Sequence, residues 1–163
     1  QNIVAVLNVY FISLESSLPV RASVIYARAR TQGLLHYILI CVGGVLVVTA
    51  VVVVPILIAP EWILSLFYGA DYGAYANVLR GISVVYVLAG LAICARVALR
   101  TTEKSQSIFA ISVFSAGASL AIAYPLITKL GVHGLVATLV FAQLTLLSGY
   151  LFVLKSVFRP GKP

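Results

Sequence analysis

Residues 37–60 read YILICVGGVLVVTAVVVVPILIAP, an uncharged run rich in Val, Ile and Leu. As an α-helix, these 24 residues reach about 36 Å at about 1.5 Å per residue. The hydrocarbon layer of a bilayer is about 30 Å thick. The run therefore predicts a transmembrane helix, and the rest of the chain can be interpreted around it.

The composition of the chain agrees with a membrane environment. Of 163 residues, 62% are hydrophobic and only 9% are charged, whereas soluble domains carry about 25% charged residues. Mean hydropathy is +1.11. Further apolar runs predict four more crossings, so that we expect an all-α membrane protein with about five transmembrane helices, near residues 2–20, 37–60, 80–96, 105–128 and 134–154.

The positions of the basic residues predict the orientation of these crossings, because cytoplasmic loops carry an excess of Lys and Arg. Nine of the eleven basic residues follow the first, third or fifth crossing: Arg21, Arg28, Arg30, Arg96, Arg100, Lys104, Lys155, Arg159 and Lys162. Only Arg80 and Lys129 fall on the other side. We therefore expect residue 1 outside and Pro163 in the cytoplasm. Short basic clusters between apolar runs indicate topology rather than nucleic-acid binding.

Motifs of catalysis or cofactor binding do not occur in the sequence. It contains no Ser-His-Asp set, no glycine-rich phosphate loop and no HExxH pattern. Cys41 and Cys94 lie in separate apolar runs without His or carboxylate at metal-ligand spacing, and we interpret both as packing residues. We expect no catalytic residue, no metal, no cofactor and no enzymatic activity.

Glu15 is the most unusual residue, because it lies inside the first predicted crossing. A carboxylate at membrane depth is costly and usually faces a bundle interior or a water-filled cavity. Two interpretations are open at this point. Glu15 either forms a structural salt bridge with Arg21 or Arg28, or takes part in ion coupling or substrate binding.

Basic and amide side chains give the other candidate site residues. The apolar stretch between Arg80 and Arg96 is only about 22 Å long as a helix, so an arginine must lie at membrane depth or snorkel. Arg96 and Arg100 are four residues apart and share a helix face. They could present guanidinium groups to a phosphate or extend to lipid headgroups. Gln143 lies mid-crossing, either packed across the bundle or lining a polar path for sugar hydroxyls.

Three stretches carry a resemblance to a known family: LESSLPVRASVIYARAR (14–30), LFYGADYGAYANVLR (66–80) and LITKLGVHGLVATLV (126–140). They resemble the polysaccharide transporter branch, with its O-antigen and exopolysaccharide flippases, of the multidrug, oligosaccharidyl-lipid and polysaccharide flippase superfamily. One departure is Thr128, where the family often has proline. The chain also has no methionine and opens with Gln1 in an apolar run, so we expect a fragment of a longer protein.

The resemblance implies that residues 1–163 form most of one six-helix lobe, the C-terminal one, of a flippase-type transporter in the cell (inner or cytoplasmic) membrane. Such a protein would move an undecaprenyl-pyrophosphate-linked oligosaccharide across the membrane by alternating access, for lipopolysaccharide or exopolysaccharide synthesis. The implied partners are this lipid-linked oligosaccharide, membrane lipids, the N-terminal lobe and polysaccharide assembly proteins. Arg28, Arg96 and Arg100 would then supply cationic groups for the pyrophosphate on the cytoplasmic side.

Two other functions remain open. A cation-coupled multidrug exporter of the same superfamily would depend on Glu15 rather than on the arginines. A non-transport subunit of a membrane assembly would need neither. An integral membrane sugar polymerase or ligase is less compatible, because those enzymes usually need a large polar outer loop, and the longest outer connection here has only about twenty residues.

Overall fold

The protein is built entirely from helices in the part of the chain that the structure, a computed structural model, describes, residues 2–158. Each long helix is long and apolar enough to cross a membrane, which confirms the expected all-α membrane fold and makes the chain a multi-pass membrane protein. The elements are α1 (Asn2–Ile58), α2 (Pro60–Tyr68), the 3-10 helix η1 (Ala70–Tyr75), α3 (Ala76–Thr101), α4 (Ser105–Leu130) and α5 (Val132–Phe158).

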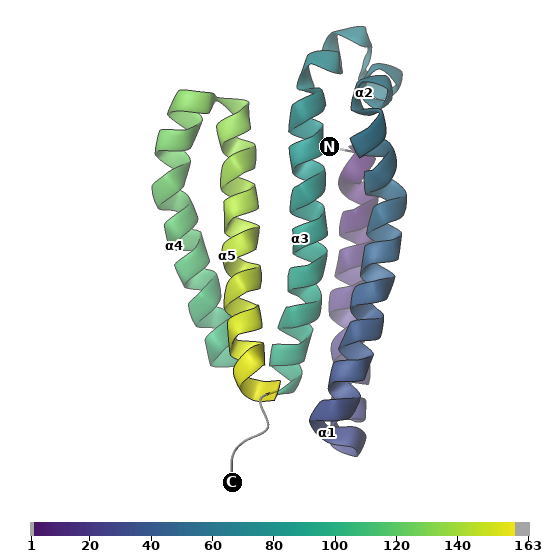
Figure 1. The fold of residues 1–163 in the computed structure, drawn as a ribbon, viewed down its shortest axis with the longest axis vertical. Helices are drawn as coiled ribbons and strands as arrows, with labels where there is room; N and C mark the ends of the chain where they lie inside the picture. The colour runs from purple at the N-terminus through teal and green to yellow at the C-terminus, as the bar shows by residue number, and fades with distance from the viewer. Residues whose placement is uncertain (1, 159–163) are drawn as a thin grey trace.

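Helix α1 is a hairpin of two helical arms. Arg30 has φ 51° and ψ −147°, which is outside the helical region and interrupts the helix. The first arm (residues 2–29) runs towards this reversal, and the second arm (residues 31–58) returns beside it (Figure 1). The segment 21–36, expected from the sequence to connect two crossings, is therefore helical on both sides of Arg30. Together with α3, α4 and α5, the two arms make five helical passes, and each pass runs opposite in direction to the one before it in the chain (Figure 1).

The helices form an open row rather than a closed bundle. α1 packs on α3, α3 on α5, and α5 on α4 (Figure 1). Burial follows this order: in α3 most residues from Gly90 to Leu99 are buried, whereas α4 buries only Ser115. Large apolar side chains such as Leu120 and Phe152 are 75% and 78% exposed. Exposed apolar faces of this extent are expected where the solvent is lipid.

The two ends of the row differ in charge. The reversal of α1, the α3–α4 connection and the last turn of α5 lie at one end (Figure 1), here named the basic end, which carries Arg28, Arg30, Arg100, Lys104 and Lys155. Arg159 and Lys162 lie outside the described residues. The opposite end carries α2 and η1, with exposed rings of Trp62, Phe67, Tyr68, Tyr72 and Tyr75. This asymmetry agrees with the pattern of basic residues and interfacial aromatic rings found in membrane proteins.

Candidate functional site

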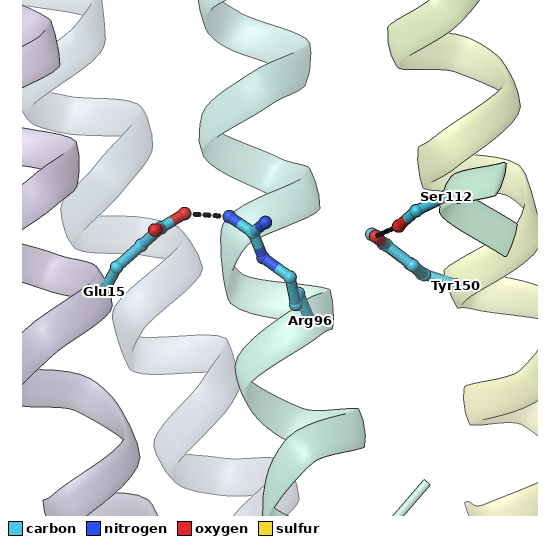
Figure 2. Close-up of polar contacts among 4 residues, drawn as sticks. All are labelled: Glu15, Arg96, Ser112 and Tyr150. Carbon is cyan, nitrogen blue, oxygen red and sulfur yellow. Dashed lines mark hydrogen bonds and ion pairs between the residues drawn. The ribbon is translucent and has the colours of Figure 1, made fainter. Parts of the chain in front are cut away.

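The structure brings together two of the five candidate site residues. Glu15, on the first arm of α1, and Arg96, on α3, form an ion pair in which Nη2 of Arg96 donates to Oε1 of Glu15. Figure 2 shows the two side chains extending towards each other from their helices. In this contact Arg96 faces the first arm of α1, and the ion-pair partner of Glu15 is Arg96 rather than Arg21 or Arg28, the partners named in one of the two interpretations of Glu15.

Helix geometry explains why Arg21 and Arg28 do not pair with Glu15. Arg28 follows Glu15 by 13 residues, which is about 20 Å along a helix. Arg21 follows by six residues, and at about 100° per residue its side chain leaves the arm on a different side. Arg96 meets Glu15 because α3 packs against α1.

The ion pair lies within the helical packing but is open on one side. Arg96 is five residues before the end of α3 at Thr101, about 8 Å inside the helix end. All residues from Ala92 to Leu99 except Arg96 are buried. The side chains of Arg96 and Glu15 are 35% and 44% exposed. The pair is therefore a fixed pair of charges beside buried apolar residues, and one face of it is accessible.

A second polar contact between the same two helices was not predicted from the sequence. Asn8 Nδ2 donates to the hydroxyl of Tyr86 over 3.1 Å, and the ring of Tyr86 stacks on Phe11 with centroids 6.2 Å apart. Asn8 precedes Glu15 by seven residues, almost two helical turns, so both lie on one face of the arm. The seven-residue spacing of Asn8 and Glu15 within an apolar run is the sequence signal from which this second contact could have been predicted. Asn8, Tyr86, Glu15 and Arg96 form what we name the polar line.

The other three candidate residues lie apart from this line. Arg28 is exposed beside the reversal of α1, and Arg100 is exposed in the last turn of α3. Gln143 is half-buried on α5, and α3 separates α5 from α1 (Figure 1). Between residues 7 and 158, none of the three has a side-chain hydrogen bond or ion pair with another side chain. Gln143 therefore makes no side-chain hydrogen bond across the bundle in this range, and its two interpretations stay open.

Contacts between α4 and α5 are polar too, but they involve hydroxyl and carbonyl groups rather than charged side chains. The hydroxyls of Ser112 and Tyr150 lie 3.1 Å apart (Figure 2), and Ser115 Oγ donates to the carbonyl oxygen of Ala142 over 3.0 Å. Ser119 Oγ is buried without a partner among the described residues. Small and hydroxyl side chains of this kind allow close helix approach in membranes, which is the role we assign to this face.

Groups that could bind a metal are absent from the part of the chain described here. No three His, Cys, Asp or Glu side chains of that part lie close enough to hold an ion. Cys41 and Cys94 are free thiols. The side chains of the polar line can pair charges and hydrogen-bond a ligand through guanidinium, carboxylate, amide and phenol groups.

Comparison of the chain with protein-family models, with curated proteins and with solved structures gives no match.

Proposed function

We propose that this chain is part of a polysaccharide transporter that moves an undecaprenyl-pyrophosphate-linked oligosaccharide across the cytoplasmic membrane by alternating access. The observation that carries the proposal is the ion pair between Glu15 and Arg96, which joins two membrane-crossing helices and is partly exposed. Ionisable side chains inside membrane segments usually mark substrate or ion paths. Three stretches that resemble the polysaccharide transporter family support the same function.

Arg96 is suited to an anionic lipid-linked substrate. Its guanidinium group can bind phosphate oxygens through two parallel N–H donors. In the structure one of its nitrogen atoms is bound to Glu15. A pyrophosphate would compete with this carboxylate for Arg96, so that the ion pair keeps the cationic group compensated when no substrate is bound.

The remainder of the polar line suits the sugar part of the substrate. Asn8 and Tyr86 offer amide and phenol groups, which hydrogen-bond hydroxyls and carry no charge. Asn8 lies about 10 Å from Glu15 along the first arm, on the side of Glu15 that faces away from the basic end. A substrate with its pyrophosphate near Arg96 would therefore extend its sugars towards Asn8.

The resembling stretches fall at the turns of the fold. Residues 66–80 form the end of α2, η1 and the start of α3, and residues 126–140 form the α4–α5 turn. Residues 14–30 run from the ion pair to the reversal of α1. With the basic end in the cytoplasm, as the distribution of Arg and Lys favours, substrate would load from that end.

A cation-coupled drug exporter is the second candidate, favoured by the 44% exposure of the Glu15 side chain. A carboxylate that must bind a cationic drug works best without a fixed counter-ion. The pairing of Glu15 with Arg96 makes this candidate the weaker of the two.

The test is complementation of a flippase-deficient strain by the full-length protein. Compared at equal amounts of protein in the membrane, surface polysaccharide should be restored by the wild type and reduced by Glu15→Gln and by Arg96→Gln. Lys129→Gln, at the opposite end, is the matched control and should restore fully. Failure to rescue together with gain of cationic drug efflux would replace the proposal by the exporter. Failure of both would favour a non-transport assembly subunit.

A further inference from the structure

An apolar groove lies between the second arm of α1, α3 and α5, near the basic end. Its volume is about 380 Å³, within the range of about 300–1,000 Å³ found for ligand pockets. Ile38, Ala98, Leu147, Leu151 and Phe158 are among the lining residues. All lining residues are apolar except one, Lys155.

Lys155 gives this groove an amphiphilic character. It lies in the last turn of α5 and is exposed. Among residues 7–158 it has no ion-pair partner. A lysine at this depth extends its ammonium group towards the headgroup region while its methylene stem covers apolar surface. The groove thus has apolar walls and, at its end, the ammonium group of Lys155 without a counter-ion.

We propose that this groove binds one acyl chain of an anionic phospholipid, whose headgroup phosphate pairs with Lys155. The charge of Lys155 and the apolar walls match the two parts of such a lipid. A second protein helix would fill the apolar part of the groove but would leave the ammonium group of Lys155 without a counter-ion unless it also carried an acid at the same height.

This lipid site is separate from the polar line. The α3 residues that line the groove, Leu91, Ala95 and Ala98, lie between about 100° and 160° from Arg96 around the helix axis, at about 100° per residue. A lipid in the groove and a substrate at Arg96 would therefore occupy different sides of α3. The proposal does not depend on what the polar line transports.

Native mass spectrometry of the full-length protein, with added dioleoyl phosphatidylglycerol or dioleoyl phosphatidylcholine, tests the site. We expect one phosphatidylglycerol molecule to be retained at least fivefold more tightly than phosphatidylcholine. Lys155→Gln should abolish this preference, and Lys155→Arg should keep it. Lys104→Gln, also at the basic end but outside the groove, is the matched control and should change nothing.

Two further variants test the acyl part of the site. Leu39 lines the groove and is 59% exposed. The larger side chain of Leu39→Trp can therefore fill the groove without disturbing the core, and this variant should retain the lipid more weakly. Equal affinity for both lipids, or an unchanged preference in Lys155→Gln, would overturn the proposal. So would cross-linking of the variant Leu39→Cys to another part of the protein or to a second copy, because a helix would then fill the groove.

Discussion

Arg96 on α3 donates a hydrogen bond to the carboxylate of Glu15 on the first arm of α1, across 81 positions of sequence. The contact compensates two charges that would each be costly alone at membrane depth. Because both side chains are partly exposed, the pair is also reachable by a ligand. Its effects on stability and on transport can be separated by experiment.

Removal of one partner should destabilise the protein more than removal of both. Glu15→Gln or Arg96→Gln leaves an uncompensated charge, and each should cost about 1 to 3 kcal/mol, between the values for exposed and buried pairs. The double variant Glu15→Gln/Arg96→Gln should regain most of this loss. Unfolding midpoints of the three variants in detergent measure the effect. Additive losses in the double variant would mean that the two side chains act independently.

The reversal of α1 should become more stable with glycine at position 30. Arg30 has φ 51° and ψ −147°, a conformation that costs non-glycine residues about 1 to 3 kcal/mol. Arg30→Gly should therefore raise the unfolding midpoint. Arg28→Gly is the matched control and should lower the midpoint, with a loss of about 1 kcal/mol in the free energy of unfolding, because Arg28 is helical and glycine disfavours helix. A lower midpoint for Arg30→Gly would contradict the backbone geometry.

The α4–α5 turn should not accept a side chain at Gly134. A Cβ atom there would collide with the backbone carbonyl of Leu126 at the end of α4. Gly134→Ala should lower the unfolding midpoint by separating the two helices. Gly117→Ala is the control: a Cβ atom at Gly117 meets nothing within 4 Å, and alanine favours helix by about 1 kcal/mol, so this variant should be neutral or more stable. Equal effects of the two substitutions would argue against the close packing of α4 and α5.

Cysteine accessibility measures the orientation. With Cys41 and Cys94 replaced in the full-length protein, a cysteine at Ala74 in η1 should react with a membrane-impermeant thiol reagent in intact cells. A cysteine at Ser105, beside the basic end, should react only after the membrane is opened. Both positions are exposed, so burial does not limit either reaction. The opposite pattern would reverse the orientation derived from Arg and Lys.

The helical passes could be predicted because the length of an uncharged apolar run can be read directly from the sequence. The run 37–60 predicts most of the second arm of α1, residues 31–58. The reversal at Arg30 could not be predicted, because arginine gives no sign of a positive φ. The helical structure on both sides of Arg30, in residues 21–36, was not predicted either, because charged residues end an uncharged apolar run before they end a helix.

The candidate site was predicted only in part. The cost of an acid in a membrane identified Glu15, and the short apolar stretch between Arg80 and Arg96 identified Arg96. Their pairing depends on the lateral order of the helices, with α3 beside α1, which apolar periodicity does not encode. The same order separates Gln143 from Glu15, and the length of the first arm places Arg28 about 20 Å along the helix from the acid.

Reconstitution into proteoliposomes tests the central claim, that the polar line lies on the path of a lipid-linked oligosaccharide. The full-length protein should move a labelled undecaprenyl-pyrophosphate oligosaccharide between leaflets, measured by its accessibility to an added glycosidase. Glu15→Gln/Arg96→Gln should lower this rate at least tenfold while its unfolding midpoint stays close to that of the wild type. A double variant that moves the lipid as fast as the wild type would contradict the account.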